Sequence, residues 1–539
     1  MPTISELFAS KLADAGIDIV FGLPGGESVP ILAALRQQGI EFVLVHNEAT
    51  AVYMADSYAR LTGKPGVCLT TLGPGATNAM AGLGHAYLDR APIIFFTARM
   101  WHELADSHTH QTIDQTAVFA PITKATFDLR PDNAANAIDE ALYLTLAGRP
   151  GPVHLQVSKQ VATQEAIAPA QPFVPPTPSA PLPMSELEKA RLLLQEAERP
   201  VMIVGLGLEP ERPYSELAGL VEAVETAVIL TPKAKGAISA ASPYYVGTLG
   251  ITRTDPAYEI LEQADCIIAV GFDIVELVKP WDETAPLVWI APWENEDVPI
   301  PAVAQLVGKM APALNYLTDL PSKDRSAWQK TIADFKARQA ARKLPEPAAG
   351  RMLPQAVLEA IHANVPDNTL VTTDVGSHKI LTALEWPSST PNRYQLSNGL
   401  SSMGFGLPAA IAASLVLNKQ PTVSIMGDGG FSMIIGELEL ITRLQTPVIT
   451  VVMNDNALDL IRAAQWRSGH DSFGTEFGNP DFMLIAQAYG IAGRRVTTLD
   501  ECAEAVREAI AASLKGKRPF LIEAMIDPVS YPTTPKRET

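Results

Sequence analysis

The chain has 539 residues, 47% of them hydrophobic and 19% charged, which is enough for three or four domains of about 150 residues, each with its own core. A formal net charge of -18 at pH 7, without any Lys/Arg cluster, argues against nucleic acid or an anionic membrane as a partner, because both would repel the protein. The cysteines stand far apart, at Cys68, Cys266 and Cys502, and match no zinc or disulfide spacing, which is typical of buried thiols in a reducing compartment.

The amino-terminal sequence MPTISELFASKLADAGIDIV has the pattern of an amphipathic helix and not of a secretory leader, and no uncharged apolar run approaches about 18 residues. We therefore expect a cytoplasmic protein. Farther along, short runs rich in Val and Ile alternate with helical patterns, for example at 41–47, 200–207 and 265–272. This alternation predicts an α/β fold of mostly parallel sheets with crossover helices.

Two stretches interrupt this alternation. APAQPFVPPTPSAPLP (168–183) has too many prolines for a helix or a central strand and predicts an extended linker. Ser185 and Glu188 come next at capping-box spacing, which predicts the start of a new helix and a new domain. A second, weaker break is RKLPEPAAGRMLP (342–354). We predict three domains, each a mostly parallel sheet with helices on both faces, over residues 1–165, 185–340 and 353–539.

The motif IMGDGGF places one acidic residue, Asp428, between glycines directly after an apolar run. The surrounding pattern predicts a strand at 421–426, a helix at 436–445 and a parallel, neighbouring strand at 446–453. Asp428 and the polar run NDN (454–456) then stand just after the carboxyl ends of two adjacent strands, so both are expected to face one crevice.

Oxygen atoms of carboxylate, amide and carbonyl groups are the ligands that Mg²⁺ prefers, and Mg²⁺ often also binds phosphate oxygens. Gly427, Gly429 and Gly430 let backbone N–H groups approach a phosphate closely, and the next helix adds its positive end. Gly-Asp-Gly is also a common turn, which is the better interpretation of an isolated match. The second polar cluster favours a site in which a metal ion holds a diphosphate.

This pair of motifs resembles the thiamine diphosphate motif, in which GDG is followed at this distance by a cluster that contains Asn or Asp. Further stretches are similar to the acetolactate synthase and pyruvate oxidase branch of that family: FGLPGG (21–26), the segment 46–93 that begins HNEATAVYMADSYARL, HTHQTIDQTAVFAPITKAT (108–126), GLSSMGFGLPAAIAA (399–413) and EFGNPDFMLIAQAYG (476–490). The resemblance covers nearly the whole chain. The run 110–123, GDGGF and the Asp of the second motif are most similar to the catabolic type of acetolactate synthase.

The resemblance implies that Glu48 binds the aminopyrimidine ring nitrogen of the cofactor and polarises it, so that the neighbouring nitrogen can remove the thiazolium proton. It also implies that Met403 wedges between the two cofactor rings, and that the backbone at Ser401 and Met403 pairs with the pyrimidine edge. Pro74 and Asn78 match further cofactor-binding positions. The alternatives are a first-turn helix glutamate for Glu48 and an ordinary core methionine for Met403.

For the metal, the resemblance assigns Asp428, Asp455 and the carbonyl of Ala457 to Mg²⁺. Most relatives have Asn at the second position, so here two carboxylates would face the metal and hold it more firmly. Asn454 and Asn456 are alternative ligands. The other implied cofactor contacts are Ser377, which replaces the family's Gln, and His378, Gly427, Gly429, Gly430, Leu458 and Leu460.

Gln111 matches the glutamine that reaches the reaction centre of acetolactate synthases, and His110 beside it is a candidate proton carrier because an imidazole titrates near neutrality. His108 and His110 fit exposed loop histidines equally well, and Gln111 fits a loop cap. Segment 458–473 should line the pocket of the second substrate. Arg462 in this segment, or Arg467 near Trp466, fits either a ligand for a substrate carboxylate or a surface salt bridge.

Several relatives bind a flavin in the central domain through an arginine-bearing stretch, but residues 271–277 read GFDIVEL here, so we expect no FAD. We therefore predict a thiamine diphosphate- and Mg²⁺-dependent enzyme that decarboxylates a 2-keto acid and joins the product to a second pyruvate, giving 2-acetolactate. A simple 2-keto acid decarboxylase, or another carboligase or lyase with the same cofactor, is the alternative. The resemblance implies an active site between subunits of a homodimer or homotetramer.

Overall fold

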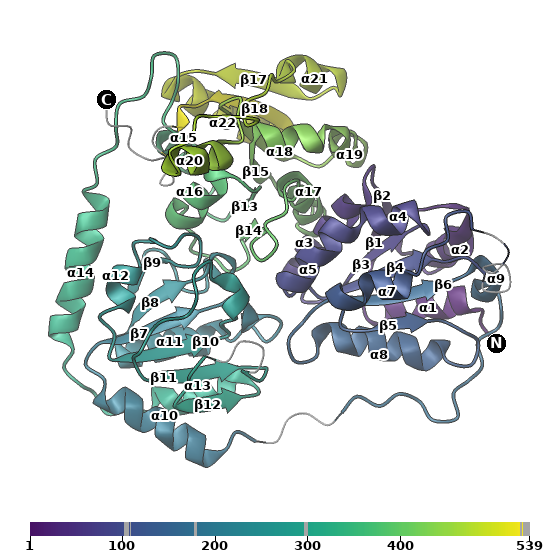
Figure 1. Ribbon diagram of the computed structural model, residues 1–539, viewed down its shortest axis with the longest axis horizontal. Coiled ribbons are helices and arrows are strands. Elements are labelled where there is room, and N and C mark those ends of the chain that lie inside the picture. Colours follow the sequence, from purple (N-terminus) through teal and green to yellow (C-terminus); the bar gives the residue numbers. More distant parts are fainter. Residues whose placement is uncertain (102–106, 108, 177–180, 296–299, 529–530, 532–539) are drawn as a thin grey trace. The chain divides into compact units, whose positions relative to one another are not determined.

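The structure is a computed structural model that describes residues 1–101, 107, 109–176, 181–295, 300–528 and 531 (Figure 1). The chain forms two compact units. The first comprises Met1–Pro178, Ser397–Lys419 and Ile434–Leu444, and the second comprises Ser179–Leu396, Gln420–Met433 and Gln445–Thr539. Two short segments of the carboxy-terminal part of the sequence therefore belong to the first unit.

The first unit contains a six-stranded, parallel sheet in the order β2-β1-β3-β4-β6-β5. Its strands are β1 (Ile19–Leu23), β2 (Glu41–Leu44), β3 (Gly66–Thr70), β4 (Ile93–Ala98), β5 (Thr126–Asp128) and β6 (Val153–Val157). Its helices are α1 (Ile4–Asp14), α2 (Val29–Gln37), α3 (Glu48–Thr62), α4 (Pro74–Asn78), α5 (Met80–Leu88), α7 (Gln115–Phe119), α8 (Ala134–Leu146), α9 (Lys159–Ala162), α17 (Gly406–Val416) and α19 (Leu438–Leu444).

The second unit contains two more parallel six-stranded sheets. The first of them has the order β12-β11-β10-β7-β8-β9, with β7 (Pro200–Val204), β8 (Ala227–Leu230), β9 (Tyr245–Thr248), β10 (Cys266–Val270), β11 (Leu287–Ala291) and β12 (Ala304–Val307). The helices that accompany it are α10 (Met184–Glu196), α11 (Tyr214–Val224), α12 (Tyr258–Leu261), α13 (Met310–Thr318) and α14 (Ser326–Ala340).

The other sheet of this unit has the order β14-β13-β15-β16-β18-β17, with β13 (Leu370–Thr373), β14 (Tyr394–Leu396), β15 (Thr422–Gly427), β16 (Val448–Asn454), β17 (Ala492–Val496) and β18 (Phe520–Met525). Its helices are α15 (Pro354–His362), α16 (Ser377–Glu385), α18 (Asp428–Met433), α20 (Asp459–Arg467), α21 (Phe482–Ala488) and α22 (Leu499–Gly516). The prediction of an α/β fold with mostly parallel sheets is confirmed.

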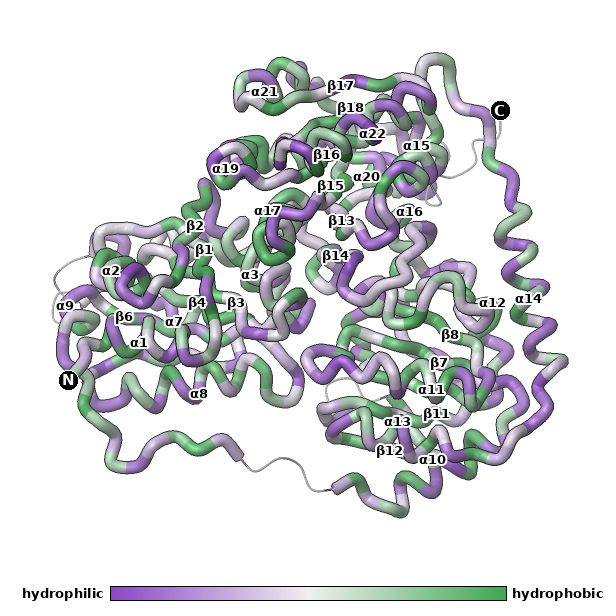
Figure 2. Tube along the Cα trace, turned by 180° about the vertical axis from the view of Figure 1, so that it is seen from behind, coloured by the Kyte–Doolittle hydropathy of each residue, from purple (hydrophilic) through white to green (hydrophobic). Residues whose placement is uncertain are grey.

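Burial explains why the strands are so apolar. A parallel sheet is covered by helices on both faces, so its strands read as continuous runs of Val, Ile and Leu. Every residue of β4, β7 and β10 is buried. Surface helices have only one apolar face. In α14 the buried residues are Trp328, Ile332 and Phe335, and Figure 2 shows hydrophilic and hydrophobic positions alternating along this helix. All three cysteines are buried and unpaired with one another, as predicted.

Some local predictions need correction. Ser185 does not cap a helix, because α10 begins one residue earlier and Pro183 stands at its N-cap; Glu188 instead accepts a hydrogen bond from the Tyr316 hydroxyl. The helix predicted at 436–445 is present as α19, preceded by a 3-10 turn at Ile435–Glu437, but the short α18 that begins at Asp428 was not predicted. The described part of 168–183 has neither helix nor strand, as predicted. In the described residues, we find no helix that combines the length and the apolar character needed to traverse a bilayer.

Candidate cofactor and metal site

Asp428 lies at the carboxyl end of β15, and the NDN run lies at the carboxyl end of β16. These strands are parallel neighbours, paired from Thr422 with Val448 to Gly427 with Met453, so the predicted adjacency of their carboxyl ends is confirmed. The Asp428 side chain is buried. Its Oδ1 accepts a hydrogen bond from the Gly429 N–H at 3.0 Å, and its Oδ2 accepts one from the Asn456 N–H at 2.8 Å.

Asn479 is a member of this cluster that the sequence analysis missed. Its Nδ2 lies 2.6 Å from Asp428 Oδ2, 3.1 Å from Asn454 Oδ1 and 3.0 Å from Asn456 Oδ1. Three oxygen atoms therefore converge on one amide donor. Because Asn479 is 51 residues from Asp428 and comes from a loop, no periodicity or spacing could have indicated it.

Asp455, the second predicted carboxylate, is held by Arg462. The guanidinium lies 3.2 Å from Asp455 Oδ2 and 2.8 Å from Asp459 Oδ1, and all three side chains are largely buried. Burial, together with the negative charges of Asp428 and Asp459, raises the pKa of Asp455 to about 7, and the Arg462 guanidinium opposes the rise. Arg462 therefore forms a buried ion pair and not a surface salt bridge, and the alternative that it binds a substrate carboxylate stays a prediction.

The loop between β13 and α16 lies against the GDG loop. Ser377 Oγ donates a hydrogen bond to Asp459 Oδ2 at 2.6 Å. His378 Nε2 accepts a hydrogen bond from the Gly427 N–H at 3.2 Å, and burial lowers the pKa of this imidazole to about 3, so it is neutral. Both predicted diphosphate contacts therefore have protein partners that fix the loop geometry.

Close packing explains two of the glycines. A Cβ atom at Gly430 would lie 1.9 Å from Oδ2 of the buried Asp374, and one at Gly427 would lie 2.9 Å from the His378 ring. Neither distance is compatible with a side chain at that position. The glycines are thus required by the protein's own packing as well as by the predicted approach of a phosphate.

These residues fit a bound Mg²⁺. Asp428 and Asp455 supply hard carboxylate oxygens, and burial raises the pKa of both, which means that the folded protein lacks enough positive charge around them. A divalent cation would supply that charge. Ala457 is buried beside them, and its N–H donates to Asp455 Oδ1 at 3.3 Å.

Leu458 and Leu460 occupy different surroundings. The Leu458 N–H donates to the Thr475 carbonyl at 2.8 Å and its side chain is exposed, whereas Leu460 packs on the core of the third sheet. Trp466 Nε1 donates to Ser472 Oγ, and Arg467 Nε donates to the Ala463 carbonyl. Arg467 is thus bound within its own helix.

The first unit brings together the residues predicted to hold the aminopyrimidine. Glu48 is the first residue of α3, which Asn47 caps, and the Glu48 side chain is buried. Asn78 Nδ2, at the end of α4, donates to Glu48 Oε2 at 3.1 Å, and Pro74 begins the same helix. A Cβ at Gly75 would lie 3.2 Å from Glu48 Oε1, so α4 packs directly against this carboxylate.

The segment that carries Ser401 and Met403 also belongs to the first unit. Ser401 is exposed with a φ of 54°, and its Oγ donates to the Asn398 carbonyl at 2.8 Å. The neighbouring Ser402 hydroxyl lies 2.6 Å from the Tyr53 hydroxyl of α3. Met403 is half-buried.

Gln111 and His110 are exposed, and His108 lies outside the described residues. Gln111 has a φ of 57°, and a Cβ at Gly73 would lie 2.7 Å from its carbonyl oxygen, so the Gln111 backbone lies beside the start of α4. A cavity of about 300 Å³ adjoins Gln111, lined also by Leu72, Arg99, Gln115 and Gln156. The structure therefore brings the Gln111 backbone close to Pro74, the first residue of the helix that packs against Glu48.

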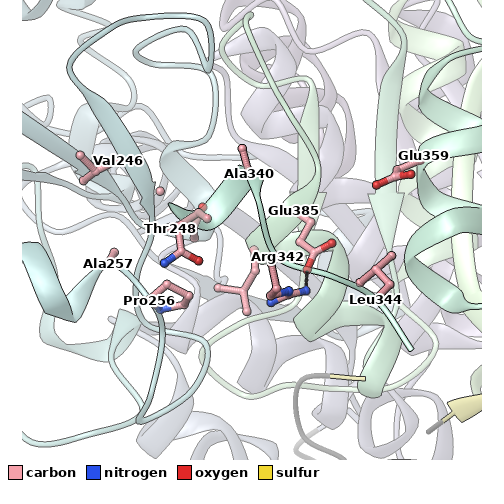
Figure 3. Close-up of a pocket in the computed structure, with 12 residues that line it drawn as sticks. Val246, Thr248, Pro256, Ala257, Ala340, Arg342, Leu344, Glu359 and Glu385 are labelled. Carbon is pink, nitrogen blue, oxygen red and sulfur yellow. Dashed lines mark hydrogen bonds and ion pairs between the residues drawn. The ribbon is translucent and has the colours of Figure 1, made fainter. Parts of the chain in front are cut away.

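A larger cavity, of about 390 Å³, lies in the second unit between β9 and the ends of α14 and α16, and no predicted site residue lines it (Figure 3). Arg342 and Glu385 form an ion pair of 2.7 Å at its wall. Its position alone identifies no chemistry.

The glycine loop after β7 is filled by the protein itself. The Leu206 N–H donates to Glu276 Oε2 at 3.0 Å, and Cβ atoms at Gly205 and Gly207 would lie 2.4 Å from that oxygen and 2.2 Å from the Trp293 ring. Burial raises the pKa of Glu276 to about 8. This loop is where a nucleotide phosphate would approach in a dinucleotide-binding sheet.

Three family profiles match the chain. They are described as the N-terminal TPP binding domain, the central domain and the C-terminal TPP binding domain of the thiamine pyrophosphate enzyme, over residues 2–118, 187–317 and 374–524. Thiamine pyrophosphate (TPP) is another name for thiamine diphosphate. The N-terminal match contains Glu48, Pro74 and Asn78, which we call the Glu48 group. The C-terminal match contains the Asp428 group, which consists of Asp428, Asp455, Asn454, Asn456 and Asn479.

Individual relatives agree over the full length. The probable acetolactate synthase large subunit of Methanocaldococcus jannaschii is 30% identical over 97% of this chain and 92% of its own length. The acetolactate synthase isozyme 2 large subunit of Escherichia coli is 31% identical over 95% of this chain and 93% of its own, and the acetolactate synthase of Bacillus subtilis is 30% identical over 97% and 93%.

The fold and the three family matches are thus those of an enzyme that uses thiamine pyrophosphate. The chain belongs to the thiamine pyrophosphate enzyme family, in its acetolactate synthase branch. The resemblance seen in the sequence is confirmed at this level.

Proposed function

We propose that the enzyme catalyses the Mg²⁺-dependent decarboxylation of pyruvate and the joining of the resulting two-carbon unit to a second pyruvate, which gives 2-acetolactate and CO₂. The observation that supports this most is the cluster of Asp428, Asp455 and three asparagine side chains at two neighbouring strand ends, in a chain that matches acetolactate synthases end to end. When bound, thiamine diphosphate supplies a nucleophilic carbon that adds to the keto group and stores the electron pair left by CO₂.

In the proposed metal site, Asp428, Asp455 and the Ala457 carbonyl hold Mg²⁺, which in turn holds the diphosphate. Two carboxylates would tend to repel the diphosphate, but Arg462 lies 3.2 Å from Asp455 and offsets part of that charge. Asn479 and the Asn456 N–H orient Asp428. The site is therefore fixed by hydrogen bonds before any metal arrives.

In the first unit, Glu48 has the role of binding and polarising the aminopyrimidine nitrogen. Asn78 binds Oε2, so we assign Oε1 to the ring nitrogen. Met403 supports the bent cofactor, Ser401 presents its backbone to the pyrimidine edge, and Gln111 approaches the reacting carbonyl from beside α4. The cavity next to Gln111 offers room for a small keto acid.

We propose that the chain works as a homodimer or homotetramer with no flavin. The Glu48 group and the Asp428 group belong to different compact units, which accords with a site completed by a second subunit. The glycine loop after β7 argues against a flavin, because Glu276 and Trp293 fill the space that its phosphates would need.

The test is to incubate the purified protein with pyruvate, thiamine diphosphate and Mg²⁺ and to identify the product. Acetolactate supports the proposal, acetaldehyde would indicate a simple decarboxylase, and no product would exclude pyruvate as the substrate. Asp428→Asn should abolish turnover and Mg²⁺-dependent cofactor binding. Asp367→Asn, the same change at an exposed loop position, should leave both unchanged and is the matched control.

A further inference from the structure

A buried ionic network joins α3, α5 and the segment that comes after β14 in sequence. His85 on α5 is fully buried; its Nε2 lies 2.9 Å from Asp56 Oδ2, and its Nδ1 lies 3.0 Å from Asp89 Oδ2 and 2.9 Å from Ser397 Oγ. Asp56 Oδ1 pairs in turn with Arg60 Nε at 2.9 Å. None of these groups has a role in the proposed reaction.

The geometry favours a charged imidazole. A carboxylate faces each ring nitrogen, and only the imidazolium can donate to both carboxylates, whereas a neutral ring would accept at Nδ1 from the Ser397 hydroxyl. Burial alone would lower the pKa of His85, but the charges and hydrogen bonds of Asp89 and Asp56 outweigh it, so the pKa is raised. The two cations, His85 and Arg60, balance the two carboxylates, and the uncharged rings of Tyr53 and Phe405 pack on the imidazole.

Two carboxylates and one imidazole this close together, those of Asp56, Asp89 and His85, can also be ligands of a metal ion. Here, however, each member already has an oppositely charged partner within 3.0 Å, and the two carboxylates lie at different nitrogens of the ring. The charges are therefore satisfied inside the protein, and a hydrogen-bonded ion network explains the arrangement without a metal.

The network holds the segment that carries Ser401 and Met403. Asp89 Oδ2 accepts the Asn398 N–H at 3.0 Å and Asp89 Oδ1 accepts the Gly399 N–H at 2.5 Å. Ser397, bonded to His85, accepts the Ser402 N–H at 3.0 Å. Three successive anchoring points thus fix the backbone immediately before Met403.

The same network reaches the helix that begins with Glu48. Asp56 lies on α3, and Tyr53 of α3 bonds the Ser402 hydroxyl at 2.6 Å. Ser57 Oγ donates to the Ala409 carbonyl of α17 at 2.9 Å, and α3 packs against both α17 and α5 (Figure 1). Residues 397–404 are therefore tied through one buried cluster to α3 and to α17.

We propose that His85 is a positioning residue, which joins Asp56 and Asp89 so that residues 397–404 are held in one conformation against α3 and α5. This inference rests on the proposed function, which places the backbone of Ser401 and Met403 at the edge of the aminopyrimidine. Cofactor-binding groups must be held to within about 0.5 Å of the productive geometry, so loss of the network should be felt there first.

The experiment compares His85→Gln with His154→Gln by calorimetric titration with two probes, thiamine diphosphate and inorganic pyrophosphate, each with Mg²⁺. His154 is the matched control, because it is equally buried in the same unit but is bonded to Thr97 and packed between Phe95 and Phe119, away from residues 397–404. Inorganic pyrophosphate reports only on the diphosphate end of the site.

We expect His85→Gln to weaken the binding of thiamine diphosphate about tenfold or more, because a hydrogen bond to a charged group is lost. The affinity for inorganic pyrophosphate should stay unchanged. His154→Gln should change neither. Ser397→Ala, a milder change in the same network, should weaken thiamine diphosphate in the same direction and serves if His85→Gln does not fold. With saturating cofactor, kcat should fall more than KM rises.

Equal affinity of wild type, His85→Gln and Ser397→Ala for thiamine diphosphate would overturn the inference, and so would a parallel loss for both probes, which would indicate a general effect on folding. A wild-type protein that bound inorganic pyrophosphate but no thiamine diphosphate would overturn the proposed function, and the inference with it.

Discussion

Replacing Arg462 by methionine tests the electrostatics of the proposed metal site. The guanidinium lies 2.8 Å from Asp459 and 3.2 Å from Asp455, is largely buried, and lies over the Trp466 ring at 5.3 Å. Methionine keeps much of the apolar contact with Trp466 but leaves two buried carboxylates without a cation. Breaking a buried ion pair by removing one partner costs about 3–5 kcal/mol, so we expect the free energy of unfolding of the metal-free protein to fall by about that amount.

Magnesium should reverse part of this loss, because a divalent cation bound at Asp455 restores positive charge. Stabilisation by Mg²⁺ with inorganic pyrophosphate should therefore be larger in Arg462→Met than in the wild type. Urea unfolding monitored by tryptophan fluorescence, with and without these ligands, measures both effects. Arg494→Met is the control, since its 2.8 Å pair with Glu504 is exposed and worth about 1 kcal/mol or less. The reasoning fails if Arg462→Met loses no more stability than this control, or if Mg²⁺ stabilises both proteins equally.

The packing and the buried charges lead to three further expected outcomes. Gly430→Ala should abolish Mg²⁺-dependent cofactor binding, because the added Cβ would lie 1.9 Å from Asp374 Oδ2. Gly436→Ala is the control and should bind the cofactor normally in the same titration, because its added Cβ would have no neighbouring atom within 4 Å. The wild type should have a larger free energy of unfolding than His85→Gln. This difference should be fully present below pH 6.5, the ordinary pKa of the imidazole, and should decline as pH rises through the raised pKa of His85. A difference that grew with pH would contradict the assigned charge. Lys235 is buried, and burial lowers its pKa to about 7, so above pH 7 the unfolded chain binds more protons than the folded protein. The free energy of unfolding should therefore rise above pH 7 by up to about 1.4 kcal/mol per pH unit. Denaturant unfolding at several pH values measures this slope, which Lys235→Met should remove.

The parts of the fold that were predictable are those determined by short-range patterns. Apolar runs bounded by glycines and polar residues identified strands such as β7, β10 and β15, and the βαβ rule placed Asp428 beside the NDN run, which the pairing of β15 with β16 confirms. The resemblance to the family assigned both Glu48 and Asn78 to the cofactor, but the hydrogen bond between their side chains was not predicted. The roles of these residues in catalysis stay predictions.

Interactions between distant loops were not predictable. Asn479 joins Asp428 across 51 residues, and Arg462 turns inward to two carboxylates although its own helix looks amphipathic and solvent-exposed in sequence. The capping box at Ser185 was wrong because three-residue spacing of Ser and Glu also occurs inside a helix, where Glu188 instead found a tyrosine. Such contacts depend on tertiary packing, which local propensity does not encode.

Numbered within each sheet, the strands of the first and the third sheets have the same order, 2-1-3-4-6-5, while the middle sheet has the order 3-2-1-4-5-6. The topological switch point therefore falls at the same place, between strands 1 and 3, in both outer sheets. In the proposed function, the ring and the anionic tail of one cofactor are each bound by loops of the same strand arrangement. Exchanging the specificity of either end would then require new loops and no new scaffold.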